Sequence, residues 1–113
     1  FYAAYSGYDG YLRWAYNSWT KHPLHDTRFR SWPAGDTYVV YPYGRSSVRF
    51  EKLIEGIQAH EKIRILREQF TASGDSAKLA QLNAWVEQCN LNSQYTDSYP
   101  ALIREWQQRL NNF

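Results

Sequence analysis

Methionine is absent from the 113-residue sequence, and cysteine occurs once, as Cys89. Because the chain begins at Phe1 and contains no start residue, we expect it to be a piece of a longer protein. One cysteine excludes a disulfide within the chain and is too few for a structural zinc site, which uses about four ligands. On an apolar helical stripe, Cys89 is better interpreted as a small buried residue than as a nucleophile.

Long apolar runs and charged tracts are also missing. No stretch of about 18 apolar residues occurs, and no charged start precedes an apolar core, so neither a membrane span nor a signal peptide is predicted. The glycines are isolated before turns, which gives no support for a phosphate-binding loop. Arg28, Phe29, Arg30 and Arg45 interleave charge with rings as in single-strand nucleic-acid grooves. Because the net charge is only +2, a nucleic-acid partner is not expected. No membrane partner is expected either, because a long apolar run is missing.

Aromatic residues are concentrated at the start of the chain, where thirteen of the twenty lie within the first 43 positions. Residues 20–36 contain two prolines and a glycine without a sustained period, which predicts a long irregular loop. A short β-rich run is expected over Thr37–Tyr41, followed by a turn through Gly44. Before the loop, residues 10–17 alternate with the period of a strand: Leu12, Trp14 and Tyr16 on one face, and Arg13, Ala15 and Asn17 on the other.

The second half of the sequence has helical periodicity. A long helix is predicted over about 47–70. Its apolar side consists of Phe50, Leu53, Ile54, Ile57 and Ile65. Ile63, Leu66 and Phe70 broaden this apolar side. Gly74 suits a left-handed stop and Asp75 an N-cap. They precede a second helix over 76–90 with a core stripe of Leu79, Leu82, Val86 and Cys89.

A third helix is predicted from Asp97 or Pro100 to Leu110, since Pro100 fits a first turn. Its apolar positions are Leu102, Ile103, Trp106 and Leu110. We therefore expect a single domain or fragment over residues 1–113. Residues 1–45 would form an aromatic-rich strand and loop part, and residues 46–113 a helical part.

Two candidate chemistries follow from the polar and aromatic residues of the first half. His22, His25 and Asp26 are close in sequence and are of types that bind metals or carry protons, but a solvated polar loop is the favoured interpretation, without metal or cofactor. Rings beside Arg, Asn and Asp instead suit a sugar, whose apolar C–H face lies on an indole or phenol. Trp14, Tyr16 and Trp19 are explained equally well as core rings, so both interpretations stay open.

Three ordered blocks carry a family resemblance: "GYDGYLRWAYNSW", "WPAGDTYVVYP" and "SSVRFEKLIEGIQAHEKIRIL". Over residues 7 to about 70 the chain resembles the C-terminal region of the bacterial domain of unknown function 4091 family, the region that ends glycoside hydrolase family 123 and related Bacteroides-type glycan hydrolases. Ala59 and His60 depart from the Asp and Tyr expected there. Tyr43 stands where a glycine commonly follows Tyr-Pro.

The resemblance implies an α/β fragment that is dominated by helices. Residues 10–17 would be the last strand of a (β/α)8-type barrel, residues 47–70 its closing helix and residues 1–6 the end of the preceding helix. A short β-hairpin and two further helices complete the expected fold. Relatives remove terminal N-acetylgalactosamine by attack of the substrate's own acetamido group, assisted by an adjacent Asp-Glu pair. No Asp is followed by Glu in this sequence, so we expect the chain to be inactive alone.

The resemblance also implies a sugar pocket at the C-terminal ends of the barrel strands. Its expected residues are Asn17 and Trp19, with Trp14 or Tyr16 one step deeper and Trp32 and Asp36 on the loop above. Leu12 would pack against the barrel layers, and Arg49 and Glu51 would brace the loop.

The expected partners are a glycan substrate and the remainder of the barrel upstream, in a parent protein that is secreted or periplasmic. Alternatively, the chain is a noncatalytic carbohydrate-binding or protein-interaction module. A lone barrel strand exposes unpaired backbone groups, so homo-oligomers are expected for the isolated chain.

Overall fold

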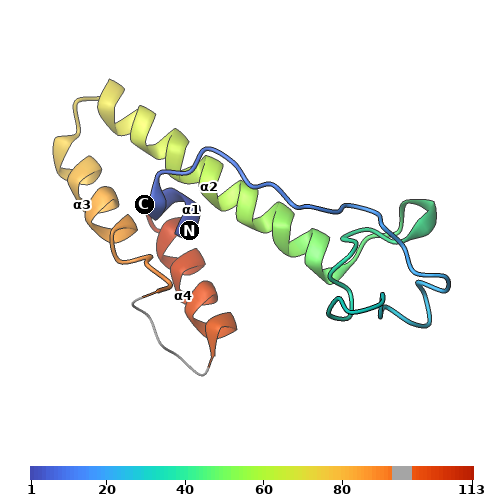
Figure 1. The fold of residues 1–113 in the computed structure, drawn as a ribbon. Coiled ribbons are helices and arrows are strands. Elements are labelled where there is room, and N and C mark those ends of the chain that lie inside the picture. The colour runs from blue at the N-terminus through green and yellow to red at the C-terminus, as the bar shows by residue number, and fades with distance from the viewer. Residues whose placement is uncertain (93–97) are drawn as a thin grey trace. The chain divides into compact units, whose positions relative to one another are not determined.

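The computed structural model describes residues 1–92 and 98–113, and helices dominate it (Figure 1). The chain divides into two compact units: Phe1–Gly10 together with Gly56–Phe113, and Tyr11–Glu55. β-structure is limited to isolated bridges in the described part of the chain. The prediction of a helix-dominated fold is therefore confirmed. The helical elements are α1 (Tyr2–Ser6), the 3-10 helix η1 (Pro42–Gly44), α2 (Val48–Ala72), α3 (Ser76–Val86) and α4 (Tyr99–Asn111).

The three long predicted helices form, with ends that differ by a few residues. Gly74 has a φ of 71°, and the carboxylate of Asp75 accepts a hydrogen bond from the Lys78 N–H at 3.0 Å, so the predicted stop and cap are confirmed. α3 ends at Val86, before the predicted position 90. α4 begins at Tyr99 with Pro100 in its first turn, and the alternative start at Asp97 lies outside the described residues.

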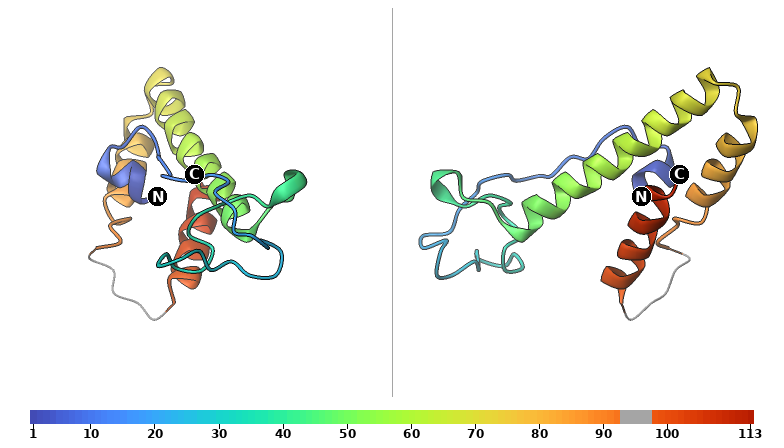
Figure 2. Two further views of the ribbon diagram at one scale, coloured as in Figure 1. Left: turned by 45° about the vertical axis from the view of Figure 1, so that its right-hand side comes forward. Right: turned by 180° about the vertical axis from the view of Figure 1, so that it is seen from behind.

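The unit made of Phe1–Gly10 and Gly56–Phe113 contains the main hydrophobic core. Phe1 packs edge-on against Trp85 and Trp106, with ring centroids 5.9 and 5.7 Å apart, and Phe113 contacts Trp85. These contacts bring the two ends of the chain together, as the three views show (Figures 1 and 2). The buried residues of this core come from α2, α3, the turn after α3, and α4: Ala59, Ile63, Leu66, Phe70, Leu82, Trp85, Val86, Cys89, Trp106 and Leu110.

The buried face of α2 differs from the predicted stripe. Ile63, Leu66 and Phe70 are buried, whereas Ile57 and Ile65 are 55% and 42% exposed. The buried residues recur at intervals of three and four, as expected where one helix meets others along a seam. Two apolar stripes run side by side on this helix, and only the positions of its neighbours decide which one is covered. The predicted apolar side of α2 is therefore buried only in part, and Ile57 and Ile65 lie outside its buried face.

The predicted strand over residues 10–17 does not form. Asn17 makes one antiparallel bridge with Tyr38, and the Val39 N–H donates to the Tyr16 carbonyl at 2.8 Å. A strand requires a continuous neighbour, and the segment that residues 10–17 meet, Thr37–Tyr41, bends after Tyr38. The predicted hairpin is likewise reduced to a single bridge between Tyr41 and Arg45 around η1.

The turn at η1 explains why the family resemblance leads one to expect a glycine at the position of Tyr43. Tyr43 has a φ of 63°, in the left-handed region, where a residue with a β-carbon is destabilised by about 1–2 kcal/mol. Its side chain is 92% exposed and gains little from packing. The backbone at Tyr43 thus has the conformation that the glycine of the resembling family would favour.

Candidate functional site

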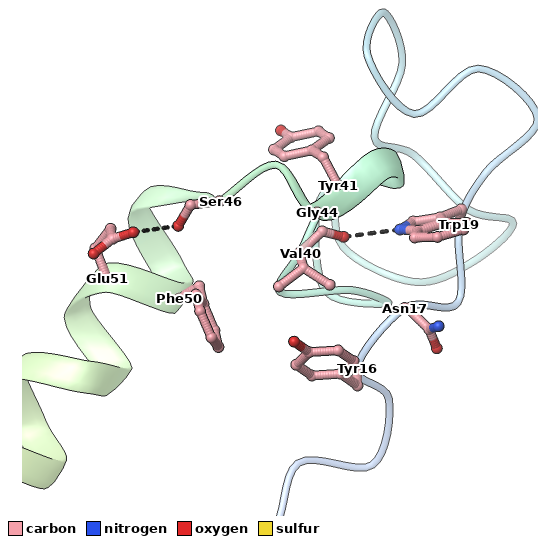
Figure 3. Close-up of a pocket in the computed structure, with 9 residues that line it drawn as sticks. All are labelled: Tyr16, Asn17, Trp19, Val40, Tyr41, Gly44, Ser46, Phe50 and Glu51. Carbon is pink, nitrogen blue, oxygen red and sulfur yellow. Dashed lines mark hydrogen bonds between the residues drawn. The ribbon is translucent and has the colours of Figure 1, made fainter.

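The unit Tyr11–Glu55 contains a concave pocket of about 330 Å³, which we call the aromatic pocket (Figure 3). It brings together Tyr16, Asn17 and Trp19, three of the residues predicted to contact a sugar. Its volume lies at the lower end of the range for small-molecule sites, about 300–1,000 Å³. The lining residues that the sequence did not indicate are Val40, Tyr41, Gly44, Ser46 and Phe50, together with Glu51, which was expected only as a brace.

Local hydrogen bonds hold the rings of the aromatic pocket in place. The indole N–H of Trp19 donates to the Val40 carbonyl at 2.8 Å, which fixes the ring edge (Figure 3). Tyr16 lies edge-on to Phe50 from the first turn of α2, with ring centroids 6.2 Å apart. Trp19 and Tyr16 remain 39% and 52% exposed. Both rings are therefore oriented by the fold and accessible to a ligand.

Besides the polar groups of its rings, the aromatic pocket has three polar lining side chains in the described part of the chain: Asn17, Ser46 and Glu51. Asn17 supplies an amide, and Glu51 a carboxylate that accepts a hydrogen bond from the Ser46 hydroxyl (Figure 3). This bond ties the start of α2 to the preceding loop, as expected for a brace. Among the described residues, Glu51 is the one carboxylate that lines this pocket. Glycoside hydrolysis commonly requires two carboxyl groups, and the described residues that line this pocket supply one.

The other predicted site residues form a separate cluster. The rings of Trp14 and Trp32 lie 4.9 Å apart and 30° from parallel, and the Trp14 indole N–H donates to the Asp36 carboxylate at 3.3 Å. Arg13 donates to the same carboxylate and to the Asp36 carbonyl. The hydrogen bond from Arg13 holds the pKa of Asp36 below its usual value. Sequence reasoning missed Arg13, although its charge opposite to Asp36 was a usable signal.

The brace predicted at Arg49 is confirmed. Its Nε and one terminal nitrogen donate to the Tyr38 carbonyl at 3.2 and 3.0 Å, and its guanidinium lies 5.5 Å from the centre of the Tyr38 ring. Tyr38 is fully buried, and its hydroxyl donates to the Pro23 carbonyl at 3.0 Å. Arg49 therefore links α2 to the loop that precedes it.

In the polar loop Asp26 pairs with a neighbouring arginine, and the lone cysteine is buried. Asp26 binds the Arg28 guanidinium at 2.8 and 2.9 Å, which lowers the pKa of that carboxyl to about 2. Over residues 1–92 and 98–113, no group of three or more His, Cys, Asp or Glu side chains could hold a metal ion. Cys89 is buried as predicted, and burial raises the pKa of its thiol to about 11, which is unfavourable for a nucleophile.

The family comparison assigns a class of enzyme to the first part of the chain. Residues 1–66, more than half of the sequence, match the family model described as the catalytic domain of glycoside hydrolase 123. The chain therefore belongs to glycoside hydrolase family 123. The matched range includes all six predicted sugar-contacting residues. No match is found among curated proteins. In the described part of the chain, no helix is both long and apolar enough for a membrane span.

Proposed function

We propose that the chain is the C-terminal segment of a hexosaminidase-like glycoside hydrolase and contributes to its sugar pocket. The observation that carries this proposal is the convergence of Tyr16, Asn17 and Trp19 on one pocket within the range that matches the family. In the same proposal, Trp14, Trp32 and Asp36 form the second part of the sugar-contacting surface. The parent protein would belong to the domain of unknown function 4091 group, including Bacteroides-type enzymes, and would be secreted or periplasmic.

The aromatic pocket has the chemistry that an N-acetylgalactosamine unit requires. The apolar face of a pyranose would lie on the accessible ring of Tyr16 or Trp19, because both expel water from the sugar's C–H groups. The Asn17 amide can donate to and accept from hydroxyl or acetamido groups. The free oxygen of Glu51 can accept from a hydroxyl. Binding and orienting the sugar are the roles we assign to this chain.

Catalysis would depend on groups outside these 113 residues. The sequence contains no adjacent Asp-Glu pair, and a complete (β/α)8 barrel needs about 250 residues. We propose that the remainder of the barrel supplies the pair and covers Leu12, which is 94% exposed here. The purified chain should therefore release no aryl group from an aryl N-acetyl-β-galactosaminide above a buffer blank. Measurable release would refute the assignment of catalysis to another segment.

Substitutions in the aromatic pocket test the binding role. In the complete hydrolase, Asn17→Ala or Trp19→Ala should lower kcat/KM on N-acetylgalactosaminides by about two- to tenfold, because one sugar contact is lost. Trp19→Phe retains a ring but loses the bond to Val40, so it separates stacking from local folding. Tyr8→Ala is a suitable control, since Tyr8 is 57% exposed and does not line the aromatic pocket. Unchanged kinetics for both pocket variants would exclude these residues from the site.

The single carboxylate at the pocket also favours a second candidate, a noncatalytic carbohydrate-binding or protein-interaction module. The gene sequence upstream of Phe1 discriminates between the two. An encoded Asp-Glu pair flanked by strand-like apolar residues supports the hydrolase, whereas an unrelated upstream domain supports the module.

A further inference from the structure

A second pocket of about 520 Å³ lies in the unit Tyr11–Glu55, and we call it the basic pocket. It shares no lining residue with the aromatic pocket. Val39 lines the basic pocket and Val40 the aromatic one, so the two sites are one residue apart along the same segment. The charged side chains that line the basic pocket are Arg13, Asp36, Arg49 and Lys52.

Among the described residues, these charges leave one cation, Arg49, without a carboxylate partner. Arg13 pairs with Asp36. Lys52 lies 2.6 Å from a carboxylate oxygen of Glu55, but both side chains are more than half exposed, so water screens this pair strongly. In residues 1–92 and 98–113 the ion pairs with carboxylates involve other cations, and Arg49 donates to the Tyr38 carbonyl instead. The pocket is therefore electropositive in a protein whose overall charge is only +2.

Arg49 is also fixed in position before any ligand arrives. Its two hydrogen bonds to the Tyr38 carbonyl use two of the five N–H groups of a guanidinium, which leaves three as donors. Gly35 borders it so closely that an added β-carbon would lie 2.7 Å from the other terminal nitrogen. A cation held on two sides loses little conformational freedom when it binds an anion.

We propose that the basic pocket binds the carboxylate or sulfate group of an acidic sugar, anchored by Arg49 and assisted by Lys52. A guanidinium presents parallel N–H groups that match the spacing of two carboxylate or sulfate oxygens. The binding of an anion follows from Arg49 and Lys52 alone. That a sugar carries this anion rests on the proposed function. The neighbouring unit of this sugar in the same glycan would occupy the aromatic pocket.

The test is titration calorimetry of the 113-residue chain with four ligands at low and at physiological salt. The ligands are N-acetylgalactosamine, its 6-sulfate, galacturonic acid and inorganic sulfate. At low salt, at least one acidic sugar should bind about tenfold or more tightly than N-acetylgalactosamine, and added salt should reduce this preference. Comparison of the two acidic sugars identifies the preferred group. Equal binding of inorganic sulfate and the sulfated sugar would refute recognition of a sugar.

Arg49→Gln should abolish the preference for the acidic sugar. Arg104→Gln, which makes the same charge change at an exposed position of α4, should preserve it. Because Arg49 also braces Tyr38, Lys52→Gln provides a second variant that leaves the brace intact, with an expected loss of about two- to threefold. Circular dichroism melts establish that each variant is folded. If Arg49→Gln unfolds, the test rests on two other results. A weaker acidic preference in Lys52→Gln that also falls with added salt supports the inference, and an unchanged preference overturns it.

The outcomes separate this inference from the proposed function. Binding of the neutral sugar without any acidic preference would overturn the basic pocket and leave the aromatic pocket standing. An Arg49-dependent acidic preference without neutral-sugar binding would support the basic pocket and count against the aromatic one. An acidic preference that survives in Arg49→Gln would also overturn the inference.

Discussion

At the residue scale, side chains that bond to the backbone stabilise the unit Tyr11–Glu55. The Ser47 hydroxyl donates to the Val39 carbonyl, Thr37 donates to the Ser18 carbonyl at 2.7 Å, and Arg49 donates twice to the Tyr38 carbonyl. In a sheet, these carbonyls would be satisfied by a neighbouring strand. Single side chains thus replace a hydrogen-bond ladder, so the loss of one of them should matter more than it would in a sheet.

Gly35 tests this dependence. Its φ is 76°, and an added β-carbon would meet the Arg49 guanidinium at 2.7 Å, so Gly35→Ala combines backbone strain with displacement of the brace. The strain alone is worth about 1–2 kcal/mol, and loss of the Tyr38 bonds adds to it. Gly44→Ala is a matched control, since Gly44 has a φ of 71° with nothing within 4 Å of the added carbon. Urea denaturation should show a larger loss for Gly35→Ala, and equal losses would mean that the brace contributes nothing measurable.

At the element scale, the helices were predictable from sequence and the β-structure was not. The stop at Gly74, the cap at Asp75 and the first-turn Pro100 depend on neighbours within a few residues, and all three are observed. A strand depends on a partner that is distant in sequence, and residues 10–17 find only one bridge. The covered side of α2 depends equally on other elements, so the apolar pattern alone could not show that Ile57 is exposed.

The candidate site was predictable to a similar extent. The sequence shows rings and a carboxylate near a loop, and for this reason all six residues were proposed together. In the structure they lie in two clusters of one unit. The sequence did not show that these residues separate into two clusters. The packing of Trp14 against Trp32 depends on how residues 20–36 fold back, which no local pattern predicts. The sequence did not predict Phe50 or Arg49 as pocket residues. Both lie in the first turn of α2, and the helical pattern does not distinguish residues that contact a loop from other helix residues.

Cys89 gives the helical core a predictable pH response. Burial raises the pKa of its thiol from about 9 to about 11, so the folded chain retains a proton that the unfolded chain loses in this range. Stability should therefore be constant with respect to this group below about pH 9, fall by up to about 1.4 kcal/mol per pH unit between 9 and 11, and level off above. Urea denaturation of the native chain and of Cys89→Ala isolates this contribution from tyrosine and lysine titration. Parallel pH profiles for the two proteins would contradict the prediction.

At the scale of the whole molecule, the two units are stabilised by different means. Ten buried residues form the core of the helical unit. In the unit Tyr11–Glu55, by contrast, fewer side chains are buried: Ala15, Thr37, Tyr38, Val39 and Ser47. Thr37, Tyr38 and Ser47 each donate a hydrogen bond to a backbone carbonyl. Several of the largest apolar side chains of this unit remain in solvent, including Leu12, Trp14 and Tyr16. Exposed large apolar side chains often mark a binding surface when they lie close together, so we expect this unit to attract a partner.

For the isolated chain we expect that partner to be a second copy. Pairing of residues 10–17 between copies would satisfy backbone groups and bury apolar surface worth roughly 25 cal/mol per Å². Light scattering after size exclusion should detect a dimer or larger assembly at micromolar concentrations. Leu12→Asp should shift it to monomer without unfolding it, because Leu12 is 94% exposed, whereas Ile57→Asp on α2 should leave it assembled. A folded monomer over this concentration range, or an assembly that withstands Leu12→Asp, would show that this surface does not pair with itself.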